Sequence, residues 1–340
     1  MRFMKHSNVA IFVPHNGCPH QCTFCNQREI TGQAYQPDEN DVKSAAETAI
    51  RFLGEKTKNA EIAFFGGSFT AIDRKYMLRL LDAAYPFIKD NTFYGIRLST
   101  RPDAVDDEVL SILKGYGVTS IELGAQSMDD HVLLMNKRGH TAADVSAASE
   151  KIRSYGFSLG LQMMTGLYGS TPETDKKTAE LLAALKPDTV RIYPTVVLNG
   201  TELADLYRSG MYKPLSLDDT VILCAGLIRF FEQKNINVIR VGLHDSDSLR
   251  ENMVSGVFHP ALRELCESRI MFENTIEALH EKKIVSGKVE FTINPKSLSR
   301  FIGQKKCNID DLYKKGIIAV VRQDAALGKY DIIINDTPLS

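Results

Sequence analysis

Three cysteines lie close together near the amino terminus of the sequence, in the stretch GCPHQCTFC: Cys18, Cys22 and Cys25. Thiolates at this C-x3-C-x2-C spacing can bind either zinc or an iron–sulfur cluster. Structural zinc sites usually pair their ligands in two short knuckles, and the sequence contains no second pair of this kind. A trio of thiolates suits a [4Fe–4S] cluster whose fourth iron stays open for another ligand. The spacing favours the cluster, and a Cys3His zinc site that includes His20 is the alternative.

The composition indicates free thiols rather than disulfides. The 340 residues carry a net charge of −1, and the other three of the six cysteines are scattered as Cys224, Cys266 and Cys307. No apolar leader opens the sequence, and its longest apolar stretch, VILCAGLI, is too short to span a bilayer. We therefore expect a cytoplasmic protein without a membrane partner, in which thiols stay reduced.

The elements that must position the cysteines alternate between strands and helices. Stretches rich in β-branched, aromatic or leucine residues predict six strands, and amphipathic segments such as residues 37–54 predict helices between them. Successive βα units predict a parallel sheet covered by helices, either an open sheet or a barrel. The strands are predicted within residues 8–15, 61–69, 94–103, 120–127, 158–167 and 189–198.

Polar residues and glycines stand at the end of nearly every predicted strand. Because the carboxyl ends of parallel strands meet at one edge of a sheet or barrel, we expect these residues to line one shared pocket. A glycine pair lets backbone approach a ligand closely, and an arginine fork suits a carboxylate or a phosphate. The strand ends in question are the cysteine loop, Gly66-Gly67-Ser68, Ser99-Thr100-Arg101, Gln126-Ser127, Gln162 and Tyr193-Pro194.

The cysteine motif and its setting resemble the radical S-adenosylmethionine (SAM) superfamily. The motif directly follows the first predicted strand, Phe24 precedes its last cysteine, and the resemblance covers residues 8–245. It implies an α/β fold, a partial (β/α)6 TIM-type barrel. It also implies that Cys18, Cys22 and Cys25 ligate a [4Fe–4S] cluster, which cleaves SAM to a 5′-deoxyadenosyl radical. An electron donor such as flavodoxin or ferredoxin is the implied protein partner.

The same resemblance gives a predicted set of SAM-binding residues. Gly66 and Gly67 match the glycine motif of the superfamily, and Ser68 stands where many members carry Glu. Resemblance to the coproporphyrinogen-dehydrogenase-like branch implies that Gln126 contacts SAM and that Arg138 contacts its carboxylate. We add four further residues to this set: Phe24, Thr100, Arg101 and Gln162.

Three long blocks carry a narrower resemblance to the radical domain of the elongator catalytic subunit family, which modifies the wobble uridine of transfer RNA. The blocks are ELGAQSMDDHVLLMNKRGHT, QMMTGLYGSTPETD and VRIYPTVVLNGTELADLYRSGMYKPLSLDD. That family spaces its first two cysteines farther apart and adds an acetyltransferase domain that does not match this sequence. We expect a radical SAM enzyme that modifies RNA, a tRNA base above all. The alternatives are a radical SAM enzyme acting on a small molecule or tetrapyrrole, and a non-catalytic, zinc-stabilised RNA-binding protein.

The end of the sequence follows a different pattern. After a radical SAM domain over residues 1–245, we predict a helical connector over 246–280 and a small α+β domain over 281–340, with the order strand, helix, helix and two strands. The segment SRFIGQKKCNIDDLYKKGI resembles the KH module, although its GxxG loop lacks the second glycine. Its basic residues are candidates for RNA phosphate contacts, with a solvated helix face as the alternative. They are Arg300, Lys305, Lys306, Lys314 and Lys315.

Overall fold

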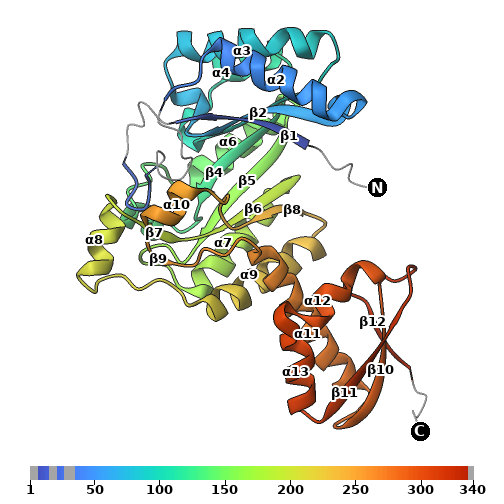
Figure 1. Cartoon of the computed structure of the whole chain (residues 1–340). Helices are drawn as coiled ribbons and strands as arrows, with labels where there is room; N and C mark the ends of the chain where they lie inside the picture. The colour runs from blue at the N-terminus through green and yellow to red at the C-terminus, as the bar shows by residue number, and fades with distance from the viewer. Residues whose placement is uncertain (1–6, 15–20, 27–34, 336–340) are drawn as a thin grey trace. The chain divides into compact units, whose positions relative to one another are not determined.

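The computed structural model of the chain describes residues 7–14, 21–26 and 35–335. The chain, which Figure 1 colours by residue number from blue to red, divides into two compact units, each made of two segments of the sequence. Unit 1 combines Met1–Leu215 with Lys234–Phe258, and unit 2 combines Ser216–Gln233 with His259–Ser340. The division of the chain at residues 245 and 280 stays a prediction. Among the described residues, no helix is both long and apolar enough to cross a membrane.

A seven-stranded parallel sheet forms the frame of unit 1. Its order is β1-β2-β3-β4-β5-β6-β8, and no backbone pairing joins the edge strands β1 and β8 in the described part of the chain. The predicted partial TIM-type barrel is confirmed, and β8 is a seventh strand that the sequence analysis did not predict. The strands are β1 (Ser7–Val13), β2 (Ala60–Gly66), β3 (Gly95–Thr100), β4 (Val118–Gln126), β5 (Ser158–Thr165), β6 (Thr189–Pro194) and β8 (Asn237–Val241).

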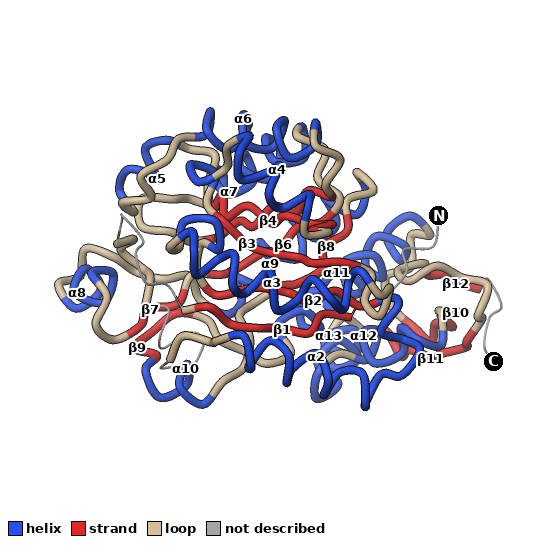
Figure 2. Tube along the Cα trace, turned by 90° about the horizontal axis from the view of Figure 1, so that it is seen from above, coloured by secondary structure: helices blue, strands red, loops and turns tan. Residues whose placement is uncertain are grey.

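Helices connect the strands, and side-chain caps fix where several of them begin. The Asp38 carboxylate accepts a hydrogen bond from the Asp41 N–H at the start of α2, and Thr141 and Thr171 cap α6 and α7 in the same way. Figure 2 shows α2 beside β1 and α6 beside β4, both on the outside of the sheet. The helices of unit 1 are α2 (Glu39–Leu53), α3 (Arg74–Lys89), α4 (Asp107–Gly115), α5 (Asp130–Met135), α6 (Ala142–Ser154), α7 (Pro172–Ala184), α8 (Glu202–Arg208) and α10 (Asp247–Asn252).

Both faces of the central strands are covered, which explains why these strands are largely apolar and do not alternate regularly with exposed polar residues. Every residue of β3 is buried, and so are the first five residues of β2. Beyond the large sheet, a two-stranded antiparallel pair joins the loop after β6 to the segment after α10. Its strands are β7 (Val196–Leu198) and β9 (Met253–Gly256).

Unit 2 packs a three-stranded sheet against helices. The sheet order is β11-β10-β12, in which β10 pairs in parallel with β11 and antiparallel with β12. The buried rings of Phe291 and Phe301, whose centroids lie 5.3 Å apart, belong to its core. The order of strand, helix, helix and two strands is the order predicted for the end of the chain. The elements are α9 (Leu217–Gln233), α11 (Leu262–Glu281), β10 (Gly287–Ile293), α12 (Leu298–Ile302), α13 (Cys307–Lys314), β11 (Ile317–Gln323) and β12 (Ile332–Asn335).

Candidate active site

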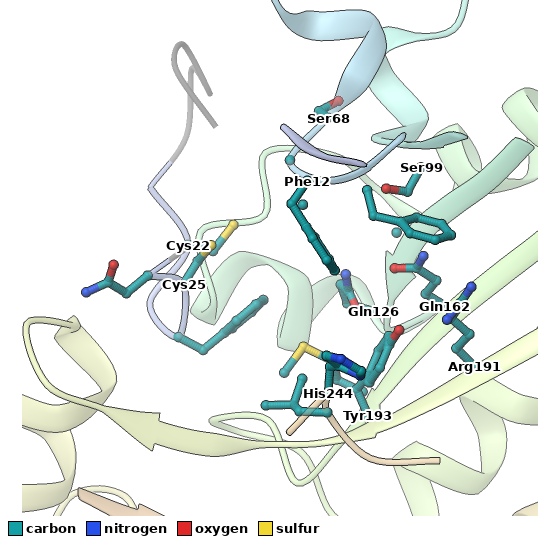
Figure 3. Close-up of a pocket in the computed structure, with 18 of the residues that line it drawn as sticks. Phe12, Cys22, Cys25, Ser68, Ser99, Gln126, Gln162, Arg191, Tyr193 and His244 are labelled. Atoms are coloured by element: carbon teal, nitrogen blue, oxygen red, sulfur yellow. The ribbon is translucent and has the colours of Figure 1, made fainter. Parts of the chain in front are cut away.

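A pocket of about 890 Å³ lies in unit 1, and every strand of the seven-stranded sheet contributes to its lining. Figure 3 shows the Cys22 and Cys25 thiols on one side of this pocket and Gln162 and Arg191 on the other. All predicted cysteine ligands and SAM-binding residues within the described part of the chain line it, whereas Cys18 lies outside the described residues. Those that line it are Cys22, Phe24, Cys25, Gly66, Gly67, Ser68, Thr100, Arg101, Gln126, Arg138 and Gln162. Ser127, which was also expected at the pocket, does not line it, and its buried hydroxyl lies 3.3 Å from the Thr178 hydroxyl.

The two described cysteines of the motif lie on a tight turn that is anchored from both sides. The Cys25 N–H donates to the Cys22 carbonyl over 3.1 Å. Between the two cysteines, the Thr23 hydroxyl donates to Asn136 Oδ1 over 2.9 Å, and the Thr23 backbone carbonyl accepts a hydrogen bond from the Leu203 N–H over 2.8 Å. The turn is thereby attached to the end of α5 and to the start of α8, which holds both thiols at the pocket.

An arginine lies directly beside the buried Cys22 thiol. Arg138 Nη1 donates to Cys22 Sγ over 3.1 Å, Nη2 donates to the Gly124 carbonyl over 2.8 Å, and the guanidinium lies 6.0 Å from the centre of the Phe24 ring. The buried Arg138 Nε has no hydrogen-bond partner among the described residues. Buried polar groups are nearly always hydrogen-bonded, so this N–H is available for an acceptor on a ligand.

Gln126 presents a second buried polar atom to the same part of the pocket. Its Oε1 finds no partner within the described chain. The residue has a left-handed φ of 66°, at a point where the pairing of β4 with β5 shifts register. Such strain in a residue other than glycine is typical of functional sites. Arg138 Nε and Gln126 Oε1 together offer one donor and one acceptor, which fits the carboxylate and amino groups of an amino-acid moiety such as that of SAM.

Glycines allow the ends of β1 and β2 to approach each other. Gly66 has a φ of 113°, and a Cβ at this position would lie 2.9 Å from the Val13 carbonyl oxygen, so a larger residue does not fit. The Gly67 N–H donates to the same carbonyl over 3.1 Å. The backbone of the glycine pair therefore lines the pocket with no side chain in between.

Three of the predicted SAM-binding residues have structural partners inside the protein. The Ser68 hydroxyl lies 2.8 Å from the Thr100 hydroxyl and accepts a hydrogen bond from the Arg101 N–H over 3.0 Å. The Arg101 guanidinium binds both carboxylate oxygens of Asp103, and its Nη2 donates to the Arg138 carbonyl over 2.5 Å. These contacts make Arg101 a positioning residue that fixes the backbone of Arg138.

A network of buried charges, which we call the charge ladder, runs across the inside of the sheet and was missed by the sequence analysis. Glu122 is at its centre and accepts from Arg97 over 3.1 Å and from Arg191 over 2.6 and 2.9 Å. Burial raises the pKa of Glu122, but the Arg191 and Arg97 guanidiniums outweigh it and hold the pKa below its usual value. The ladder consists of Glu61, Arg97, Glu122, Gln162 and Arg191.

The ladder lies below the predicted strand ends and supports one wall of the pocket. Gln162 Nε2 donates to Glu122 over 2.9 Å, so this predicted SAM-binding side chain is held by the ladder. Gly160 makes room for the ladder, because a Cβ there would lie 2.7 Å from Glu122 Cγ. A signal was present in the sequence, since charged residues interrupt otherwise apolar strands. Arg240 and His244, which line the pocket beside Arg191, were not among the residues predicted from the sequence.

The comparison with protein families agrees with this geometry. Residues 12–182 match the radical SAM superfamily, and residues 187–271 match the radical SAM C-terminal domain. The chain is 27% identical over 239 residues to the tRNA uridine(34) acetyltransferase of Dehalococcoides mccartyi (strain CBDB1), an alignment that covers 61% of this chain and 52% of the relative. It is 32% identical over 241 residues to Homo sapiens Elongator complex protein 3, covering 65% of this chain and 43% of that protein.

Among solved structures, the chain is similar to the archaeal Methanocaldococcus infernus Elp3 with an N-terminal deletion. The TM-score is 0.61 at 22% identity, and the alignment covers 82% of this chain and 63% of that one. At this identity the similarity shows the fold alone. The chain spans about half the length of the curated relatives it matches.

Proposed function

We propose, from the premise that the chain belongs to the radical SAM superfamily, that its pocket holds a [4Fe–4S] cluster and SAM. Members of this superfamily are enzymes that use both groups, and the chain is an enzyme, which leaves the non-catalytic alternative without support. The observation that carries the proposal is the convergence at one pocket of the cysteine turn, the glycine pair and two buried polar atoms without described partners.

Each residue of the pocket has a specific task in this proposal. Cys18, Cys22 and Cys25 would ligate the cluster, and the cluster with SAM would supply radical chemistry for the abstraction of a hydrogen atom from the substrate. Arg138 Nε donates to the carboxylate of SAM, and Gln126 Oε1 accepts from its amino group.

The remaining residues shape the space around these groups. The Gly66-Gly67 backbone allows the ligand to approach β2, since no Cβ intervenes. Phe24 covers the Arg138 guanidinium and excludes water from it, which strengthens its contact with a carboxylate. Arg101 keeps Arg138 at its position through the hydrogen bond to its carbonyl. The Gln162 amide, fixed by Glu122, faces the pocket as a neutral contact for the adenosine.

We further propose that the substrate is RNA, and specifically a base of transfer RNA. The names of the similar proteins, a tRNA uridine(34) acetyltransferase and Elongator complex protein 3, support this assignment. Lys305 and Lys306 in unit 2 are exposed and adjacent, with φ of 52° and 66°, in the loop between α12 and α13. Exposed lysines of this kind can contact phosphates and make binding dependent on salt.

The other basic residues of unit 2 differ in how far they are available to RNA. Arg300 is half-buried and forms an ion pair with Glu267 over 2.5 Å, so it has a structural role within unit 2. Lys314 pairs with Asp311 on the exposed face of α13. We therefore assign RNA phosphate contacts to Lys305, Lys306 and the exposed Lys315, and not to Arg300.

A comparison of modified nucleosides tests the RNA assignment. Transfer RNA from a strain that lacks the gene is digested and its nucleosides are quantified by mass spectrometry beside those of the parent strain. We expect one modified nucleoside to disappear, and to return when the gene is supplied but not when Cys22→Ala is supplied. Identical profiles in the two strains would contradict the RNA assignment and favour a small-molecule or tetrapyrrole substrate.

A further inference from the structure

Two arginines face each other on neighbouring strands, on the side of the pocket opposite the cysteines. Arg191 of β6 and Arg240 of β8 are direct partners in the register of the sheet, and both line the pocket. Figure 3 shows Arg191 and Tyr193 on this side, across from Cys22 and Cys25. The two strands pair in parallel, and like charges on neighbouring residues of paired strands repel each other. Something else must therefore compensate this pair.

Only one of the two arginines has a carboxylate partner in the described part of the chain. Arg191 binds both oxygens of Glu122, whereas Arg240 donates to the Gly242 and Leu243 carbonyls, each over 3.0 Å, and to His244. The charged members of the ladder balance one another, because Glu61 and Glu122 carry two negative charges and Arg97 and Arg191 carry two positive ones. Among the described residues, the half-buried Arg240 is therefore a surplus positive charge, and a partly buried charge without an ionic partner is unfavourable.

The histidine beside Arg240 adds a neutral donor. Arg240 Nη2 lies 3.2 Å from His244 Nδ1. A guanidinium only donates hydrogen bonds, so Nδ1 must accept, and the proton of the neutral ring is then on Nε2. His244 is exposed at the edge of the pocket, and its Nε2–H can donate to the same ligand as Arg240. The side chains of Arg240 and His244 therefore suit an acceptor with several oxygens.

We propose that Arg240, with Arg191 and His244 beside it, binds an oxyanion of the substrate, and that this oxyanion is a phosphate of the RNA. The identification of the phosphate rests on the proposed function. An oxyanion at this point neutralises the surplus charge and reduces the repulsion between the Arg191 and Arg240 guanidiniums. The carboxylate of SAM has its own partner in Arg138 on the cysteine side. The substrate is then fixed by its phosphate on one side of the pocket, with the reacting base between this anchor and the cysteines.

RNA binding by charge-matched variants tests the anchor. The reconstituted full chain is titrated with a fluorescein-labelled anticodon stem-loop, and anisotropy is measured over a range of salt concentrations. We expect Arg240→Gln to weaken binding by about 10-fold and to lower the salt slope by about one ion. Arg240→Lys keeps the charge and should retain part of the affinity. Arg153→Gln removes an exposed arginine of the outer helix α6 and should bind as the parent does.

A second measurement separates the anchor from the RNA assignment. Phenylglyoxal modifies arginine side chains, and peptide mass spectrometry reports the modified sites in the full chain. We expect inorganic phosphate to protect Arg240 and to leave Arg153 reactive. Protection without stem-loop binding would support the anion site and overturn its assignment to RNA. Equal reactivity of Arg240 with and without phosphate, together with parental RNA affinity and salt slope in Arg240→Gln, would overturn the anion site itself.

Discussion

The two sides of the pocket differ in how their buried polar groups are satisfied. On the cysteine side, formed by Cys22, Cys25, Gly66, Gln126 and Arg138, two buried polar atoms have no partner in the described chain. On the ladder side, Glu122 accepts hydrogen bonds from two arginines and from a glutamine. The first arrangement is completed by a ligand, and the second is largely complete by itself. Substitutions of polar side chains on the cysteine side should therefore change ligand binding, and substitutions in the ladder should change folding stability.

The largest effect is expected from the loss of a cluster ligand. Removal of a residue that only orients a metal ligand typically lowers metal affinity or activity by about 10–100-fold. Removal of a ligand itself should cost more, so Cys22→Ala should lower SAM cleavage by at least about 10³-fold, with a matching loss of bound iron. Iron content and 5′-deoxyadenosine are measured after anaerobic reconstitution. Cys307→Ala, which removes an exposed thiol of unit 2, is the control and should behave as the parent does. Full iron content in Cys22→Ala would contradict the assignment of the cysteine side.

Breaking the charge ladder should give the next largest effect, on stability. Glu122→Gln leaves the shape of the side chain but removes the charge that compensates Arg97 and Arg191. Loss of one partner of a buried ion pair costs about 3–5 kcal/mol, so the free energy of unfolding in urea should fall by about that amount. Glu202→Gln breaks the exposed pair with Lys137 and should cost less than about 1 kcal/mol. Similar losses for both variants would refute the stabilising role of the ladder.

A third comparison concerns the backbone of the cysteine side. Gly66→Ala introduces a Cβ 2.9 Å from the Val13 carbonyl at a φ of 113°, whereas Gly54→Ala meets no atom within 4 Å at a φ of 53°. A positive φ alone costs a residue other than glycine about 1–2 kcal/mol. We expect Gly54→Ala to lose about 1 kcal/mol and Gly66→Ala about 3 kcal/mol, together with weaker SAM binding. Equal losses would mean that the close approach of β1 and β2 does not matter.

A buried carboxylate that forms no ion pair among the described residues provides a reference for Glu122. Burial raises the pKa of Asp175 to about 7, although the Gly166 N–H donates to it over 2.8 Å. The unfolded Asp loses its proton near 3.8 and the folded one only near 7, so ionisation increasingly favours the unfolded state as the pH rises between these values.

The Asp175→Asn variant removes this titration and should gain stability relative to the parent as the pH rises. Between pH 5 and 8 the difference in unfolding free energy should increase by about 3 kcal/mol, and it should level off above the folded pKa. Urea denaturation at several pH values measures it. A difference that stays constant over this range would contradict the raised pKa of Asp175. It would also contradict the statement that burial raises the pKa of both Asp175 and Glu122.

The cysteine side was predictable from the sequence because its parts are local. Cys22 and Cys25 lie on one turn, Gly66 and Gly67 are adjacent, and polar residues at strand ends mark the edge of a parallel sheet. The ladder side could not be predicted in this way, because its strands each contribute one residue and the pairs depend on register. The pairing of Arg191 with Arg240 follows a shift at the preceding residue of β6, which no local pattern indicates.

The fold shows the same limit of local patterns. The six predicted strands lie in longer, largely apolar stretches, whereas β8 is a five-residue strand, NVIRV, whose Arg240 interrupts the apolar pattern and lines the pocket. The left-handed φ of Gln126 likewise depends on the register shift between β4 and β5. The sequence therefore predicted which residues stand at the strand ends, but not which of them lack partners.

The central claim is that the cysteine side holds a redox cluster and SAM, and one measurement tests it most directly. The full chain is reconstituted anaerobically with iron and sulfide, reduced with dithionite, and incubated with SAM. We predict about four irons per chain and the formation of 5′-deoxyadenosine. Stoichiometric zinc in the purified protein, with no iron retained and no 5′-deoxyadenosine formed, would contradict the account.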